Sequence, residues 1–79
     1  MTEEAEQAKR KEKFAKTIHW RKDANEAWHG SIHLADGYGC GVSAMPGEKA
    51  RVAKSFIKDR LFEMATRIAK ERGTEIILD

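Results

Sequence analysis

Apolar and polar residues alternate along three stretches in the first half of the chain, and a period of two residues is typical of β-strands. The alternation covers residues 16–22, 27–34 and 38–45. Two segments with the composition of turns, Asp23-Ala24-Asn25 and Ala35-Asp36-Gly37, separate these stretches. The pattern therefore predicts three antiparallel strands joined by two hairpins.

The turns also predict which residues face each other. A first hairpin centred on Ala24 places Trp20 opposite Trp28 and His19 opposite His29, and aromatic cross-strand pairs stabilise sheets. A second hairpin, with Gly37 in the left-handed conformation, aligns the next two strands. The pairs expected there are Leu34 with Tyr38, Ile32 with Cys40 and Gly30 with Val42.

A helical period replaces the alternation after Pro46-Gly47. Residues 48–72 are predicted to form a long helix that ends before Gly73. Its expected core face comprises Ala53, Phe56, Ile57, Arg60, Leu61, Met64, Ala65 and Ile68. Residues 3–16 are predicted to form a polar helix with a thin apolar stripe. Such a helix either docks on the rest of the protein through Phe14 and Ala15 or frays.

This order of elements predicts an α+β fold: an N-terminal helix, a three-stranded antiparallel sheet, a long helix packed on one face, and a short C-terminal strand over residues 74–78. The 79 residues suffice for a single domain, 1–79, in which residues 1–14 are a more loosely attached helix. The predicted centre of the core is Trp20, Trp28, Ile32, Phe56, Leu61, Met64 and Ile68.

Composition bears on the setting of the protein. Cys40 is the one cysteine, so the chain has neither an internal disulfide nor a cysteine pair for zinc, and we expect Cys40 in the core. The acidic N-terminus lacks the apolar segment of a signal peptide, and the apolar run Ile76-Ile77-Leu78 cannot span a bilayer. These features predict a cytoplasmic protein without a membrane partner.

Catalytic signals are weak. His19, His29 and His33 are expected on the sheet face opposite the core, where His19 and His29 approach each other without a third metal ligand. Ser31 and Ser43 lie on strands rather than in a nucleophile elbow. We therefore predict no enzyme activity, no metal and no cofactor, with a His-dependent nuclease as the remote alternative.

Small residues leave part of the same sheet face bare. Gly39, Gly41 and Ser43 alternate along the third strand, although glycine weakens strands. Either another backbone approaches there, from the N-terminal helix, a partner protein or a nucleic acid, or the glycines serve a tightly twisted hairpin.

A basic stripe on the long helix is the strongest functional signal. Arg51, Ser55, Lys58 and Phe62 follow one another at helical spacing, and Lys54 lies beside them. Basic side chains suit phosphates, and an exposed phenylalanine suits a base or the apolar pocket of a partner. Alternatively, Phe62 packs under the N-terminal helix while the lysines are merely solvated.

Two segments resemble the second half of a double-stranded-RNA-binding domain, over residues 28–58. They are Asp36-Gly37-Tyr38-Gly39-Cys40-Gly41-Val42-Ser43 and Lys49-Ala50-Arg51-Val52-Ala53-Lys54. The resemblance implies a helix, three strands and a helix, with Lys49, Arg51 and Lys54 as phosphate ligands. The element order is also similar to that of small phage and bacterial α+β proteins, including HicB-type antitoxins and phage inhibitors of host defence.

The sequence thus predicts a non-enzymatic module that binds nucleic acid through a basic helix face. The predicted site residues are Lys49, Arg51, Lys54, Ser55, Lys58 and Phe62. The alternative is a protein-binding inhibitor or accessory factor. A homodimer, formed through the open edge of the final strand at residues 75–78, is a further expectation.

Overall fold

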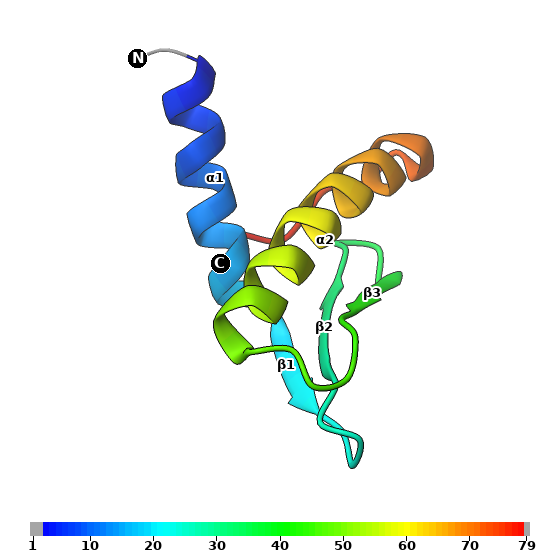
Figure 1. Cartoon of the computed structure of the whole chain (residues 1–79). Helices are drawn as coiled ribbons and strands as arrows, with labels where there is room; N and C mark the ends of the chain where they lie inside the picture. Colours follow the sequence, from blue (N-terminus) through cyan, green and yellow to red (C-terminus); the bar gives the residue numbers. More distant parts are fainter. Residues whose placement is uncertain (1–2, 79) are drawn as a thin grey trace.

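The computed structural model describes residues 3–78 and has the predicted α+β architecture. Its elements, in chain order, are α1 (Glu3–Thr17), β1 (His19–Lys22), β2 (Trp28–His33), β3 (Gly39–Ser43) and α2 (Ala50–Arg72), as Figure 1 shows. The expected C-terminal strand is wrong. Residues 74–78 make one isolated bridge, between Ile76 and Leu34, which leaves them beside the end of β2.

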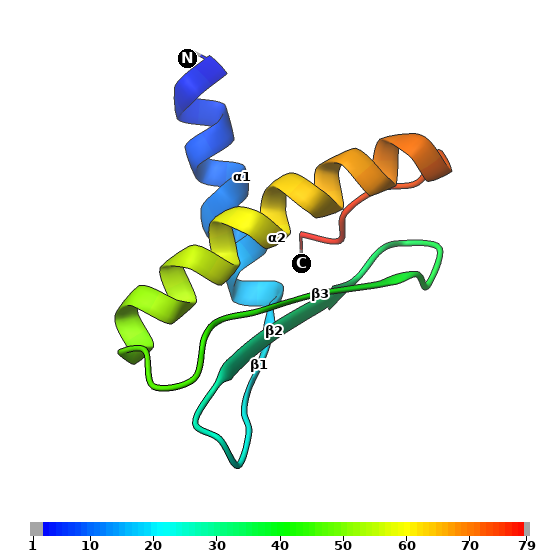
Figure 2. The ribbon, with the colours of Figure 1, turned by 45° about the vertical axis from the view of Figure 1, so that its right-hand side comes forward.

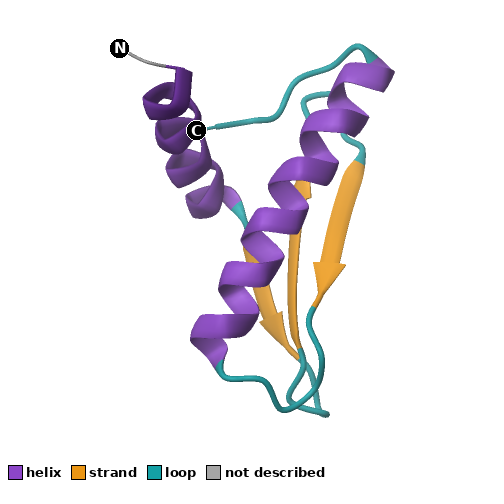
Figure 3. Ribbon diagram, turned by 45° about the horizontal axis from the view of Figure 1, so that its top comes forward, coloured by secondary structure: helices purple, strands orange, loops and turns teal. Residues whose placement is uncertain are grey.

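The strands form an antiparallel sheet in the order β1-β2-β3, and both helices lie on the same side of it (Figures 2 and 3). Helix α2 runs over β2 and β3. Ile32, Cys40 and Leu61 are buried between the sheet and α2, whereas His19, Ser31 and His33 are exposed on the outer face. The alternation predicted from the sequence therefore assigns the two faces of the sheet correctly.

The second hairpin has the predicted register. Ile32 lies opposite Cys40 and Gly30 opposite Val42. Gly37 has a φ of 91°, and the amide of Leu34 donates a 2.8 Å hydrogen bond to the carbonyl of Tyr38. Glycine adopts this backbone conformation without the steric cost that a side chain adds, so the turn follows from the sequence.

The first hairpin is shifted by two residues from the predicted register. Trp20 lies opposite Gly30 and Lys22 opposite Trp28, so the expected pairing of the two tryptophans is wrong. The turn is centred on Asn25, one residue later than we assumed, because Glu26 adopts a left-handed φ of 62° and the amide of Asp23 donates to the carbonyl of Ala27. A shift of two residues preserves the face of every side chain.

Helix α2 is rotated relative to the predicted core face. Its buried residues recur every four positions: Ala53, Ile57, Leu61, Ala65 and Ala69. Phe56, which we expected in the core, is 47% exposed, so this part of the prediction is wrong. Trp20, Trp28, Met64 and Ile68 are half-buried at the margin of the core, while Ile32 and Leu61 are confirmed at its centre. Gly73 ends the helix as predicted, with a φ of 68°.

Helix α1 docks on α2 through its C-terminal half. Phe14 is fully buried and meets the ring of Phe62 edge to face, with 5.1 Å between ring centroids. Lys11 forms an ion pair with Asp59 of α2. The expectation of an exposed Phe62 is therefore wrong, and the alternative, in which Phe62 packs under the N-terminal helix, is confirmed.

Candidate nucleic-acid interface

The beginning of α2 presents positive charge. Lys49 is the N-cap residue, its side chain caps no backbone amide, and the first turn contains no acidic residue. The first amides of a helix lack intrahelical partners and carry the positive end of the helix dipole. Lys49 and Arg51 add exposed side-chain cations there. This end of α2 therefore attracts anions, phosphates among them.

Two tryptophans hold further cations beside the start of α2. The ammonium nitrogen of Lys54 lies 4.5 Å from the ring centroid of Trp28 and 5.7 Å from that of Trp20. Lys22, which faces Trp28 across the hairpin, places its ammonium nitrogen 5.8 Å from the same ring. Cation–π attraction of this kind favours particular positions for long, flexible side chains. We call Lys22, Lys49, Arg51 and Lys54 the cationic patch.

Gly30 is the reason that α2 can approach the tryptophans so closely. A Cβ at this position would lie 2.5 Å from Cγ2 of Ile57 and 3.3 Å from Cζ3 of Trp20. With no side chain at Gly30, Ile57 packs directly onto the sheet, and Lys54, one turn earlier on α2, lies above the two indole rings.

The predicted site residues divide into two groups. Lys49, Arg51 and Lys54 lie in the cationic patch, and Ser55 is exposed on the next turn of α2. Lys58 is half-buried, and Phe62 belongs to the packing against α1. Sequence reasoning missed Lys22. Its one signal is the cross-strand pair with Trp28, and the incorrect register of the first hairpin concealed it.

The outer sheet face carries a hydrogen-bonded chain of three side chains. Nδ1 of His29 lies 2.6 Å from Oγ of Ser43, and Nε2 lies 2.7 Å from Oδ2 of Asp23. The hydrogen bond to His29, with those from the amides of Ala27 and Asn25, holds the pKa of Asp23 below its usual value. The histidine that approaches His19 is not His29, as expected, but His33, at 6.5 Å between ring centroids.

A carboxylate, an imidazole and a hydroxyl in this order can activate a nucleophile. Ser43 is exposed and, together with His29, lines a hollow of the outer face. These three side chains join the β1–β2 loop to β3. Within residues 3–78, no cluster of three or more His, Cys, Asp or Glu side chains could hold a metal ion.

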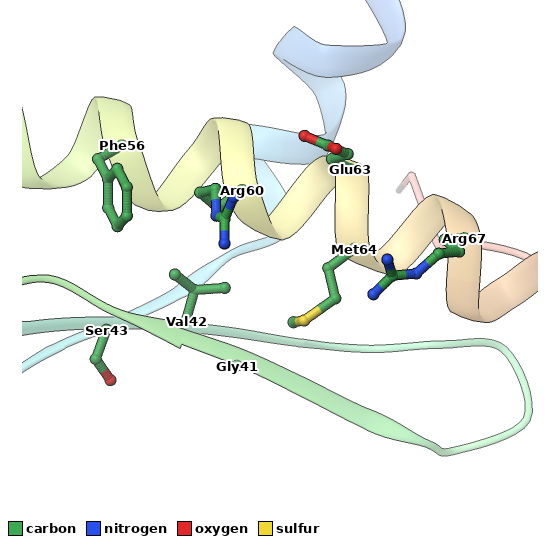
Figure 4. Close-up of a pocket in the computed structure, with 8 residues that line it drawn as sticks. All are labelled: Gly41, Val42, Ser43, Phe56, Arg60, Glu63, Met64 and Arg67. Atoms are coloured by element: carbon green, nitrogen blue, oxygen red, sulfur yellow. The ribbon is translucent and has the colours of Figure 1, made fainter.

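A groove of about 360 Å³ lies on the other flank of α2, between this helix and β3. Figure 4 shows Phe56, Arg60, Met64 and Arg67 extending from α2 toward β3. Glu63 completes the helical wall of the groove. This flank thus combines an exposed aromatic ring with charges of both signs, in contrast to the cationic patch.

Comparison of the chain with protein-family models, with curated proteins and with solved structures gave no significant match. In the described part of the chain, neither helix is long and apolar enough to cross a membrane. The geometry of the two flanks of α2 is therefore the basis for assigning a function.

Proposed function

We propose that this protein binds nucleic acid by gripping backbone phosphates with the cationic patch, and that duplex RNA is its ligand. The observation that carries the proposal is the position of Lys54 and Lys22 over the ring of Trp28, beside the uncapped start of α2. Cations from two separate elements converge there with amides that have no capping side chain.

Two physical arguments support the proposal. Contacts with the indole rings restrict the lysine side chains before the ligand arrives, which reduces the entropy that binding costs. Each phosphate that a lysine or arginine neutralises releases condensed counterions, so a patch of this kind gains affinity at low salt. The half-buried rings of Trp20 and Trp28 add surfaces on which the ribose or a base can pack.

The order of elements supports duplex RNA in particular. Helix, three strands and helix is the order that the resemblance to double-stranded-RNA-binding domains implies. The residues that this resemblance assigns to phosphates, Lys49, Arg51 and Lys54, all belong to the cationic patch. The buried, free thiol of Cys40, whose pKa is raised by desolvation, fits the cytoplasmic setting that we also propose.

The test is the salt dependence of binding to a labelled RNA duplex of about 20 base pairs, measured by fluorescence anisotropy. The double variant Arg51→Gln/Lys54→Gln should bind more weakly at every salt concentration. Its slope of log affinity against log salt should fall by about two, since each lost phosphate contact contributes about 0.9.

Helix α1 offers a matched control. Arg10 and Lys13 have the same residue types at the same spacing, are exposed, and lie on the helix that projects from the body of the molecule (Figure 1). The variant Arg10→Gln/Lys13→Gln should keep most of the slope. Equal losses in both variants, or a slope that neither variant changes, would overturn the proposal. Single-stranded RNA and duplex DNA of the same sequence test the preference for duplex RNA.

A second candidate function, protein binding, is favoured by apolar side chains outside the core. Met45 is 73% exposed, Val52 is 53% exposed and Phe56 is 47% exposed. Val52 and Phe56 are four residues apart in α2 and share one face of the helix, and adjoining exposed apolar side chains commonly mark an interface. Phe62, the anchor that we expected for a protein partner, packs against Phe14 and cannot serve that role. Phe56 takes its place in this second candidate function.

A further inference from the structure

Strand β3 is an edge of the sheet whose outward backbone groups have no strand beside them in residues 3–78. The amide of Leu34 donates to the carbonyl of Tyr38, and the amide of Ala44 donates to the carbonyl of Trp28. These two bonds show which residues of β3 direct their backbone groups toward β2. Backbone groups alternate in direction along an antiparallel strand. Cys40 and Val42 therefore point their amides and carbonyls toward β2. The residues that point theirs outward are Gly39, Gly41 and Ser43.

From this edge, we propose that β3 pairs with β3 of a second copy of the chain, antiparallel and about a two-fold axis at Gly41. In this register Gly41 faces Gly41 of the partner subunit, and Gly39 faces Ser43 of the partner subunit. It is the register in which all three outward residues find a partner, and each pair exchanges two hydrogen bonds. The two sheets then form one continuous sheet.

The position of α2 fits this arrangement. Helix α2 packs over the central strand β2 and the edge strand β3. With strands about 4.8 Å apart, a helix above the space between β2 and β3 lies about 5 Å from the two-fold axis. The two copies of α2 are then about 10 Å apart, within the range in which helices pack side by side.

The groove-lining side chains are complementary to themselves under this symmetry. Gly41, which lies on the proposed two-fold axis, lines the groove from β3 below Arg60 and Met64 of α2, as Figure 4 shows. The symmetry makes α2 antiparallel to its copy. Arg60 then faces Glu63 of the partner subunit, and Phe56 faces Arg67 of the partner subunit. Each contact occurs twice, as a two-fold interface requires. In the first contact an arginine meets a carboxylate, and in the second an arginine meets an aromatic ring.

The proposal replaces the dimer that the sequence suggested. That dimer used the edge of residues 75–78, which instead lie beside β2, where the amide of Ala35 donates to the carbonyl of Glu75. The new interface does not depend on the proposed function, because it uses the flank of α2 beside β3 and not the cationic patch.

The first test blocks the backbone edge. Sedimentation equilibrium of the wild-type chain should give twice the 9.0 kDa of one copy, with dissociation on dilution. In Gly41→Pro the amide that is lost points away from β2, so the hydrogen bonds with β2 survive while the edge is blocked. This variant should be monomeric. Gly41→Ala is the matched control and should remain a dimer, because its Cβ meets no heavy atom closer than 3.6 Å.

The second test exchanges charges and does not depend on how Gly41→Pro folds. Arg60→Glu and Glu63→Arg should each be monomeric, because each variant places like charges opposite each other. An equimolar mixture of the two should form a heterodimer, since every pair across the interface is then attractive. The double variant Arg60→Glu/Glu63→Arg should dimerise with itself.

Three results would overturn the proposal. The first is a wild-type chain that remains monomeric at millimolar concentration. The second is a dimer that Gly41→Pro leaves intact. The third is a pair of charge variants that do not associate when mixed although each is folded by circular dichroism. Only intermolecular contacts can rescue association in the mixture, so an effect confined to the helix itself would not produce the expected result.

Discussion

The two hairpins of the sheet have the same type of turn, but different residues occupy the position that requires a positive φ. In each, a backbone amide bonds to the carbonyl four residues on: Asp23 to Ala27 in the first hairpin and Leu34 to Tyr38 in the second. In each, the last loop residue has a positive φ, 62° at Glu26 and 91° at Gly37. Glycine favours this conformation and glutamate does not, so the sequence predicted the register of the second hairpin correctly but not that of the first.

Each of the two loops is stabilised by an aspartate of its own. Asp23 accepts a hydrogen bond from the amide of Asn25, and Asp36 accepts one from the amide of Tyr38. The other carboxylate oxygen joins each loop to a neighbouring element, through His29 in the first hairpin and through Arg72 of α2 in the second. The first turn therefore depends on side-chain contacts to hold a backbone that its own residues disfavour.

The largest effect is expected at Gly30 in β2, the strand that both hairpins share. Gly30→Ala places a Cβ 2.5 Å from Cγ2 of Ile57 and should destabilise the protein by about 1–3 kcal/mol, the usual cost of overpacking. Urea unfolding measures the loss. Gly41→Ala, whose Cβ has ordinary contacts, is the control and should change little. An unchanged midpoint for Gly30→Ala would show that α2 does not pack closely on β2.

The second effect concerns Gly37. Gly37→Ala has free space around its new Cβ but keeps a left-handed backbone, so it should cost about 1–2 kcal/mol through backbone strain alone. The thermal midpoint should fall accordingly. If Gly37→Ala is as stable as the wild type, the second hairpin does not depend on its glycine in the way that we describe.

The third effect has the opposite sign. Glu26→Gly removes the strain of a left-handed glutamate and adds entropy to the unfolded chain, and the difference should stabilise the protein by up to about 1 kcal/mol. Calorimetry of Glu26→Gly beside Gly37→Ala compares the two turns directly. A destabilised Glu26→Gly would mean that the glutamate side chain contributes to the first turn.

The smallest effect is a dependence on pH. Hydrogen bonds lower the pKa of Asp23, mainly that from His29, and the pKa of Asp36, mainly that from the amide of Tyr38, below the unfolded value of 3.8. Their contribution is therefore complete above pH 3.8 and is lost as the pH falls through the lower, folded pKa values. Asp23→Asn and Asp36→Asn should each flatten this acid limb, as measured by urea unfolding at several pH values. Equal slopes in variants and wild type would contradict the prediction.

The sequence by itself determined the features that depend on local chemistry. The alternation in the strands assigned each side chain to a face, Gly37 determined the second turn and its register, and Gly73 ended α2. It also grouped Arg51 with Lys54, because neighbouring residues of a helix lie close together whatever surrounds them. Lys49 was added by the resemblance to double-stranded-RNA-binding domains.

Only the tertiary structure decided which apolar side chains are buried and which distant residues meet, where the local sequence permits more than one outcome. Phe56 and Ile57 are adjacent apolar residues, and helical periodicity permits either in the core. The space above Gly30 accepts Ile57, so Ile57 turns inward and Phe56 turns toward β3. Phe62 is covered because Phe14 of α1 packs against it, and Lys22 joins Lys54 because a loop held by Asp23 shifts the first hairpin by two residues. These outcomes depend on the shapes of surfaces that meet only when distant segments pack together, and periodicity along the chain carries no information about them.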